Sequence, residues 1–503
     1  MSSARRPIIF NENAKDWRTP PSESADAAFA FHQRHFNYQP TKLIALPDIA
    51  ADIGVKQIYV KSEVSRFDLS SFKILGASWG VFRCLAARLN LPLTATLQDI
   101  KTALDGSHYT LYAATDGNHG RAVARMASIL GMSAEIHVPY GLSSAAIASI
   151  ESEGAQVVVS QGNYDVSISD ADKASQHSYG LLIQDYAFGD YLDVPQWIVD
   201  GYQTMMREID DQLGGDSASL VIAPAGVGSF AQAVTSYFKQ QGKDTAVVCV
   251  EPDTAACIWK SFQHGELISK VNTPTIMAGL DCGTPSKIAW PVLRHGVDAS
   301  ITISDFEAHL ACKRLADIGV PVGPCGAAAL AALLRMGADD KVHLGLDCDS
   351  IVVLMCTEGA RDYAIPHDVG SDSATELANT LVQLENIVDQ PEDTGENESH
   401  VTRFISHWLE HRDIDTHYID IVNRRPPLVD VPPGARRTSA TLCPLVRRGL
   451  DGSNQYEKEY SNDEGIPPRM KSGLAAAMIA TAVAKQATRG NVKLCARLQE
   501  EYN

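Results

Sequence analysis

The stretch Ser70-Ser71-Phe72-Lys73-Ile74-Leu75-Gly76-Ala77 places a lysine where small hydroxyl residues lead into an apolar helical pattern. Two further motifs follow along the chain, Thr115-Asp116-Gly117-Asn118-His119-Gly120 and Ala225-Gly226-Val227-Gly228-Ser229. A buried lysine amine can bond an aldehyde cofactor covalently, and the protein must then hold the cofactor's ring and phosphate. The three motifs in this order predict an enzyme that uses pyridoxal 5'-phosphate (PLP).

The bulk composition limits the class of protein. A chain of 503 residues predicts two or three domains, and 45% apolar with 21% charged residues is typical of a soluble globular protein. A net charge of −18 argues against a nucleic-acid or anionic-membrane partner. No apolar run reaches the ~18 residues of a membrane helix, the N-terminus does not resemble a secretory signal, and the ten cysteines are scattered. We therefore expect a cytoplasmic protein.

The pattern of apolar residues predicts the domain organisation. Residues 1–45 read as an irregular N-terminal arm with one helical stretch at 24–34. Residues 46–366 alternate short apolar runs with helical segments, which is typical of parallel α/β architecture. The predicted strands are 57–60, 110–114, 134–138, 156–159, 219–223, 246–250 and 350–354. We expect two lobes with parallel sheets and a cofactor between them, near the carboxyl ends of the strands.

The composition changes after residue 366. Residues 367–399 read as a linker followed by a helix, and residues 400–503 form a separate C-terminal segment. The stretch 422–469 is rich in arginine and proline and shows little periodicity, so no secondary structure is predicted there.

Each motif also has a structural interpretation. Lys73 lies near the start of a predicted helix with Ser70 or Ser71 as its N-cap, and taken alone it could be a solvated surface lysine. The turn that contains Asn118 could hold a cofactor ring oxygen, or could simply cap the following helix. The presence of all three motifs favours the functional interpretation.

The glycine loop at 225–229 follows a predicted strand and leads into a helix, so its backbone N–H groups can bind a phosphate. The dinucleotide fingerprint needs a further glycine where this chain has Ala231, which disfavours NAD. Later in the chain, Cys356 and Thr357 close a predicted strand. A neutral thiol or hydroxyl there could contact the pyridine nitrogen, or the segment could be an ordinary loop.

The motifs resemble those of the diaminopropionate ammonia-lyase family, whose members are PLP enzymes of the tryptophan-synthase-β group (fold type II). The resemblance covers about residues 25–366. It is carried by Phe72 to Gly76, Thr115 to Gly120, Gln184-Asp185-Tyr186-Ala187-Phe188, Val194 to Ile198, Gly201 to Met205, Ala225 to Phe230 and Thr275 to Gly283. It implies a two-lobed fold and PLP as the cofactor.

The resemblance also implies roles for individual residues. Lys73 would bind the cofactor and act as acid and base at the substrate's α-carbon, Asp116 would be the second acid and base, and Asp185 would bind the substrate's amino group. Asn118 would contact the ring hydroxyl. The phosphate would be held by Gly226, Val227, Gly228 and Ser229. The implied reaction is α,β-elimination of ammonia from a small amino acid, most directly 2,3-diaminopropionate, and fold relatives are commonly homodimers.

The chain departs from the family at two places. It has Asp68-Leu69-Ser70-Ser71 where the lyases have Gly-Leu-Asn-Ala, which is closer to the serine and threonine dehydratases. It has Gly323-Pro324-Cys325-Gly326 where the lyases have Gly-Glu-Ser-Gly, so a carboxylate near the cofactor is expected to be lost. A dehydratase, a β-replacement enzyme and a non-catalytic PLP-binding scaffold therefore remain alternatives.

Residues 374–503 resemble the start of a zinc aminoacylase or acetylornithine-deacetylase-type metallopeptidase. The matching stretches are Trp408 to His417 and Met470 to Met478. The family's His-x-Asp pair is absent, and Arg469 stands where a bridging carboxylate would bind the metal. We expect a degenerate, partial α/β segment without a metal.

Overall fold

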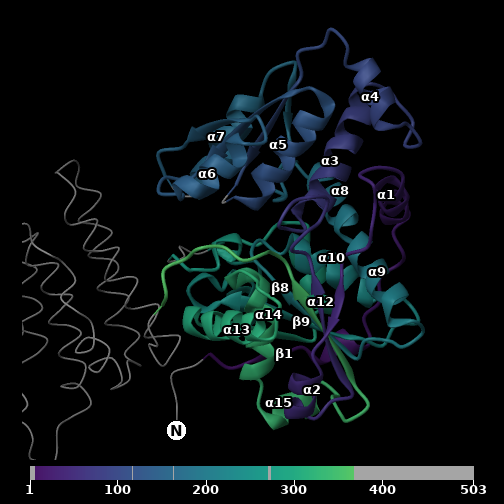
Figure 1. Cartoon of the computed structure of the whole chain (residues 1–503), viewed down its shortest axis with the longest axis vertical. Helices are drawn as coiled ribbons and strands as arrows, with labels where there is room; N and C mark the ends of the chain where they lie inside the picture. Colours follow the sequence, from purple (N-terminus) through teal and green to yellow (C-terminus); the bar gives the residue numbers. More distant parts are fainter. Residues whose placement is uncertain (1–5, 116, 163, 270–273, 367–503) are drawn as a thin grey trace, which may run out of the picture. The chain divides into compact units, whose positions relative to one another are not determined.

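Two sheets organise the residues that the computed structural model describes, which are 6–115, 117–162, 164–269 and 274–366. Figure 1 shows each sheet within its own lobe. The large sheet has seven strands in the order β1 (Ile9–Phe10), β10 (Ala299–Ile303), β9 (Ala246–Pro252), β8 (Leu220–Pro224), β11 (Ile351–Cys356), β3 (Gln57–Ser62) and β2 (Leu43–Ala45). The small sheet has four, in the order β6 (Gln156–Val159), β5 (Ser133–Val138), β4 (Thr110–Ala114) and β7 (Gly180–Leu182).

The helices surround these sheets. Those that accompany the small lobe and the junction are α3 (Lys73–Arg88), α4 (Leu97–Ala103), α5 (Asn118–Leu130), α6 (Ser144–Glu151), α7 (Tyr164–Ser175) and α8 (Asp193–Tyr202). The others are α1 (Glu23–Arg34), α2 (Pro47–Ile53), α9 (Thr204–Leu213), α10 (Ser229–Phe238), α11 (Cys257–His264), α12 (Ala289–Gly296), α13 (Asp305–Asp317), α14 (Pro324–Arg335) and α15 (Ala338–His343).

The five inner strands of the large sheet are parallel, whereas its two edge strands run antiparallel to their neighbours. Both edge strands come from the N-terminal 45 residues, where the sequence predicts an irregular arm. They are only two and three residues long, too short to show the alternating pattern of a strand. The helix expected at 24–34 is present as α1.

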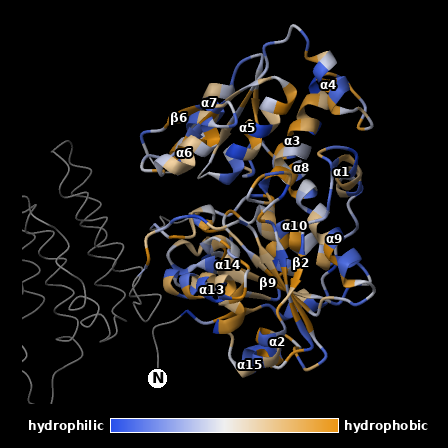
Figure 2. Cartoon of the chain, in the orientation of Figure 1, coloured by the Kyte–Doolittle hydropathy of each residue, from blue (hydrophilic) through white to orange (hydrophobic). Residues whose placement is uncertain are grey.

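Alternation along each strand divides the large sheet into two buried faces. Val221 and Val353 pack in the hydrophobic cluster that also contains residues of α10 and α12. Their neighbours Leu220 and Val352 face the opposite side, in the cluster with α13 and α14. Parallel strands covered on both faces read as nearly continuous apolar runs, and this explains why the sequence marks them so clearly. In Figure 2, much of the ribbon in the interior of this lobe, around β9, has the orange colour of hydrophobic residues.

The small lobe has the same layered construction. Leu111 and Ala113 of β4 face α5, whereas Tyr112 and Ala114 face α7. Helix α5 approaches the sheet closely at Gly120, where an added Cβ would lie 2.4 Å from Thr115 Cγ2. This contact fixes the start of α5 directly behind the end of β4.

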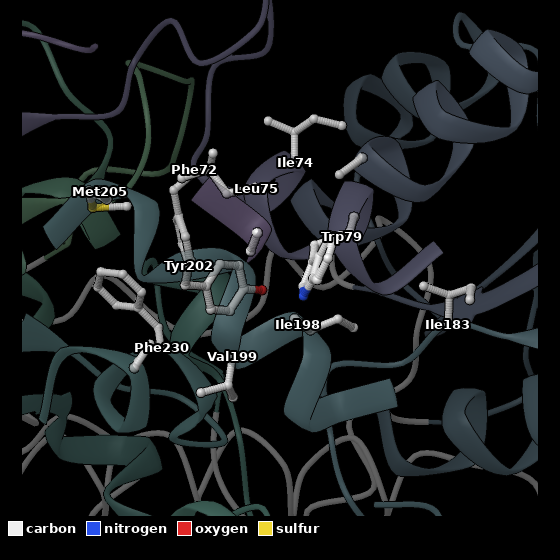
Figure 3. Close-up of a cluster of buried hydrophobic side chains, with 14 of the residues drawn as sticks. Phe72, Ile74, Leu75, Trp79, Ile183, Ile198, Val199, Tyr202, Met205 and Phe230 are labelled. Atoms are coloured by element: carbon white, nitrogen blue, oxygen red, sulfur yellow. The ribbon is translucent and has the colours of Figure 1, made fainter. Parts of the chain in front are cut away.

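Helices α3 and α8 pack tightly where the two lobes meet. A Cβ on Gly201 would lie 2.5 Å from the carbonyl oxygen of Leu75, so the two backbones touch. Figure 3 shows the aromatic side chains around this contact, with the ring of Phe72 between those of Tyr202 and Phe230. The ring centroid of Phe72 lies 4.8 Å from that of Tyr202 and 4.4 Å from that of Phe230. The residue before Lys73 is thus anchored in the core.

The α/β fold predicted from the sequence is confirmed, with each predicted strand present within a few residues. The sequence missed β7 and β10. Strand β7 has only three residues, and β10 alternates apolar residues with serine and threonine, so neither stood out as an apolar run. The N-cap of α3 is Phe72 rather than a serine, although the Ser71 hydroxyl accepts a 3.3 Å hydrogen bond from the Lys73 N–H group.

The prediction for the C-terminal segment, residues 367–503, lies outside the described residues. Within the part of the chain that the structure describes, no helix has both the length and the apolar character needed to cross a membrane.

Candidate active site

A cavity of about 620 Å³ lies at the carboxyl ends of β4, β8 and β11, between the two lobes. This is the edge of the sheets where loops converge and where α/β proteins bind ligands. Most of the residues predicted from the sequence line it: Lys73, Asn118, Asp185, Gly226, Val227, Gly228, Ser229 and Thr357. Asp116, the predicted second base, lies outside the described residues.

Lys73 begins α3 and projects into this cavity. Its amine forms an ion pair with the carboxylate of Asp185, which follows β7. The Lys73 side chain is 19% exposed and that of Asp185 only 3%. The Lys73 Nζ atom also lies 5.3 Å from the ring centroid of Phe72 and 5.8 Å from that of Tyr202. A cation–π contact with each ring contributes to holding the amine in place.

The ion pair sets the charges of both groups. Burial lowers the pKa of the Lys73 amine, but the Asp185 carboxylate, together with Tyr202 and Cys282, outweighs burial and raises that pKa above its usual value. Burial raises the pKa of Asp185, whereas His119, when protonated at acid pH, and Lys73 lower it, and the net direction is downward. Both groups are therefore charged near neutral pH when no other molecule occupies the cavity.

His119 completes a row of buried polar groups with these two residues, although no role was predicted for it. Its Nε2 atom lies 2.8 Å from the carbonyl oxygen of Ile183, and its Nδ1 atom lies 3.8 Å from Asp185 Oδ2. Burial lowers the pKa of His119, so the ring is neutral near pH 7. Because a carbonyl oxygen only accepts, Nε2 carries the proton and Nδ1 presents its lone pair toward Asp185.

The glycine loop between β8 and α10 has the shape of an anion cradle. Gly228 has φ +95°, a left-handed conformation, and its Cβ would lie 2.9 Å from Leu293 Cδ1. A Cβ on Gly226 would lie 3.0 Å from Cys282 Sγ. The N–H groups of the first turn of α10 have no acceptor within the helix, so they can bind a phosphate. The Ser229 hydroxyl donates to the backbone oxygen of Asp185 and links the cradle to the acidic residue.

The structure separates the two residues that the sequence offered as partners of the pyridine nitrogen. Cys356 faces the cluster of α14, because alternation along β11 places it on the same side as Leu354. Thr357 falls on the other side and lines the cavity. Its Oγ1 atom is buried and has no hydrogen-bond partner among the described residues. A buried hydroxyl without a partner is expected where a ligand supplies one, so Thr357 suits the ring nitrogen.

Glu358 places a carboxylate beside the stretch where the lyases carry one and this chain has Pro324 and Cys325. Its side chain lies at the start of α14, beside Pro324 and Cys325, and lines the cavity. One carboxylate oxygen is 3.1 Å from the Asn118 Nδ2 atom. No role was predicted for Glu358 from the sequence, because nothing local places it beside residues 323–326. Its place directly after Thr357, in a stretch already singled out, was the available signal.

These features fit the predicted cofactor: an amine for an aldehyde, a cradle for a phosphate and an unpaired hydroxyl for a ring nitrogen. The two-lobed fold and this site define a class of enzymes, and residues 35–357 match the family model described as pyridoxal-phosphate dependent enzyme. The chain belongs to that family, and its predicted PLP cofactor is confirmed.

Within the family, the chain is similar to the diaminopropionate ammonia-lyases. It is 34% identical to that of Escherichia coli (strain K12) over 357 residues, which cover 67% of this chain and 89% of the relative. It is 33% identical to the Salmonella typhimurium (strain LT2) protein, covering 68% and 90%. The crystal structure of the Escherichia coli lyase in complex with D-serine matches with a TM-score of 0.65, 32% identity, and coverage of 70% of this chain and 93% of that one.

A more distant solved structure shares the fold alone. Maize serine racemase matches with a TM-score of 0.57 at 22% identity and covers 69% of this chain. The resemblance predicted from the motifs is therefore confirmed for the family and fold. The metallopeptidase-like resemblance falls on the C-terminal segment, outside the described residues.

Proposed function

We propose that this protein is a PLP-dependent ammonia-lyase that converts 2,3-diaminopropionate and water into pyruvate and two molecules of ammonia. The observation that carries the proposal is the ion pair of Lys73 with Asp185 in a cavity that also contains a phosphate cradle. The similarity to diaminopropionate ammonia-lyases over most of their length supports the substrate.

The residues of this chain divide the chemistry among them. When bound, the cofactor supplies an electron sink that makes the substrate's α-proton removable. Lys73 would hold the cofactor and exchange a proton with the α-carbon, and Asp185 would bind the substrate's amino group. Because Asp185 already pairs with an ammonium group in this structure, a substrate ammonium can take the same place.

The remaining residues would hold and orient the cofactor. Gly226, Val227, Gly228 and Ser229 would bind the phosphate, Asn118 the ring hydroxyl and Thr357 the ring nitrogen. A hydroxyl partner does not require the ring nitrogen to be protonated, which suits β-elimination better than transamination. Asp116 would be the second acid and base, serving the opposite enantiomer.

The experiment is pyruvate release by the PLP-loaded protein with D- and L-2,3-diaminopropionate, L-serine and L-threonine in parallel, with 2-oxobutyrate measured for threonine. Turnover of diaminopropionate above serine supports the proposal. Turnover of the hydroxy amino acids alone would make the protein a dehydratase. No turnover of any of the four substrates, with the cofactor bound, would favour a β-replacement enzyme or a non-catalytic scaffold.

The proposal includes a homodimer, a cytoplasmic location, and a C-terminal segment that holds no zinc. Light scattering after size-exclusion chromatography measures the oligomeric state. Stoichiometric zinc in the purified full-length chain would contradict the expectation for the tail.

A further inference from the structure

Glu358 occupies a junction between three segments that build the cavity. It follows β11, and the adjacent backbone pairs with the segment that leads to Lys73. The Gly359 N–H group donates to the Ser70 oxygen at 2.9 Å, and the Phe72 N–H group to the Thr357 oxygen at 3.4 Å. Glu358 is therefore held by main-chain contacts beside the start of α3. Its side chain contacts the other two segments, which are the start of α5 and the start of α14.

The Glu358 carboxylate is buried, with its side chain 6% exposed, and both oxygens are engaged. Oε2 accepts from Asn118 Nδ2 at 3.1 Å, and Oε1 accepts from the Cys325 N–H group at 3.1 Å. The Arg361 Nε atom lies 3.3 Å from Oε1. A buried carboxylate with a cation and two further donors is well satisfied, so its position is well defined.

The beginning of α14 is shaped to receive this carboxylate. Gly323 leaves the space, because a Cβ there would lie 2.6 Å from Glu358 Oε1. Pro324 occupies the first turn and has no N–H group, so Cys325 supplies the donor. The N-terminus of a helix also favours a negative charge. The Gly323-Pro324-Cys325 sequence thus provides both the space for the Glu358 carboxylate and an N–H group that donates to it.

The bond to Glu358 decides which way the Asn118 amide points. A carboxylate only accepts hydrogen bonds, so the atom facing it is the amide nitrogen, which keeps a second N–H group. Asn118 begins α5 in the small lobe, whereas Glu358 follows β11 in the large lobe. The same hydrogen bond therefore joins the two lobes across the cavity.

We propose that Glu358 is a positioning residue that holds the Asn118 amide, and with it the start of α5, in the orientation from which Asn118 can donate to the cofactor's ring oxygen. This inference rests on the role proposed for Asn118 and does not depend on which amino acid is the substrate.

The test is a double-mutant cycle on PLP binding without substrate. Apo protein carrying Glu358→Ala, Asn118→Ala or both is titrated with PLP, and the pH dependence of the visible absorbance of the bound cofactor is recorded. We expect Glu358→Ala to weaken PLP binding about tenfold or more, the scale of a lost hydrogen bond to a charged group. Adding it to Asn118→Ala should change the affinity less than about twofold, because coupled residues are not additive.

The absorbance separates positioning from general support of the fold. Glu358→Ala should shift the pH at which the cofactor spectrum changes in the same direction as Asn118→Ala, because both remove the same contact to the ring oxygen. Glu358→Gln keeps the size but has one acceptor oxygen for three donors, so it should fall between wild type and Glu358→Ala. It provides the same test if the alanine variant does not fold.

Glu307→Ala is the matched control. Glu307 accepts from the Ser304 N–H group at the start of α13 and so caps another helix. The Glu307→Ala variant should leave the PLP affinity and the absorbance spectrum of the cofactor unchanged. Equal effects of Glu358→Ala with and without Asn118, or an unchanged spectrum, would overturn the inference. Failure to turn over diaminopropionate would contradict the proposed function, but it would not affect the measurements of PLP affinity and absorbance that test this inference.

Discussion

The amine of Lys73 and the carboxylate of Asp185 form a partly buried ion pair although 112 positions separate them in the chain. Lys73 starts α3, and Asp185 follows the edge strand of the small sheet. The pair forms because both segments end at the same cavity. It places a cation that can become a nucleophile beside an anion that can later bind another ammonium group.

Replacing Lys73 with alanine removes the covalent anchor for the cofactor. We expect pyruvate release from diaminopropionate to fall by a factor on the order of 10²–10⁴ or more, the range for losing a positioned acid and base. Mass spectrometry after borohydride reduction should find PLP attached to the wild-type chain and absent from Lys73→Ala. Lys56→Ala, at an exposed ion pair with Asp216, is the control and should keep both properties.

Replacing Asp185 with asparagine should change the pH dependence of cofactor attachment. Attachment requires the neutral amine, and Asp185 raises the pKa of Lys73. Without the carboxylate, burial remains and lowers that pKa. The rate at which apo Asp185→Asn gains visible absorbance with PLP should therefore rise at lower pH than in wild type. A profile that stays in place, or moves to higher pH, would show that Asp185 does not hold the charge of Lys73.

Replacing Gly228 with alanine combines a strained backbone with a clash inside the phosphate cradle. Its φ is +95°, and the new Cβ would meet Leu293. We expect weaker PLP binding and a loss of about 1–3 kcal/mol in the free energy of unfolding. Gly265→Ala is the matched control, because its φ is +75° with open space around it. It should lose stability without losing PLP affinity, as measured by urea unfolding and PLP titration.

Glu208 stabilises the fold away from the cavity. Its carboxylate pairs with Lys61 and with Arg66, all fully buried. Glu208→Gln leaves these cations incompletely paired, so we expect a loss of about 3–5 kcal/mol in urea unfolding at neutral pH. Asp216→Asn, in the exposed pair with Lys56, should cost only about 0–1 kcal/mol.

The same carboxylate should make stability depend on pH. Burial raises the pKa of Glu208, but its hydrogen bonds and charge contacts with Arg66 and Lys61 lower it, and the net direction is downward. Its contribution is therefore complete above the unfolded value of about 4.3 and is lost as the pH falls through the lower folded value. Stability of Glu208→Gln should depend less on acid pH than wild type. An equal acid loss in both would contradict this role.

Local patterns were enough for seven of the eleven strands in the described residues and for the three motifs. Parallel strands covered on both faces usually read as nearly continuous apolar runs, and a lysine, an asparagine turn and a glycine loop are each contiguous in the chain. Asp185 needed the resemblance to a known family, because nothing in its own neighbourhood marks it as the partner of Lys73. Cys356 and Thr357 were both predicted as partners of the pyridine nitrogen, because the sequence at the end of a strand does not show which of two neighbouring side chains faces the cavity.

The sequence by itself determined that this is a two-lobed α/β protein with a lysine, a phosphate cradle and a PLP cofactor, because these depend on short segments with local rules. Only the tertiary structure decided that Glu358 reaches both Asn118 and the start of α14, that His119 lies beside Asp185, and that residues 9–10 and 43–45 complete the large sheet. Those relationships join segments far apart in the chain, and long-range distances follow from packing of the whole fold.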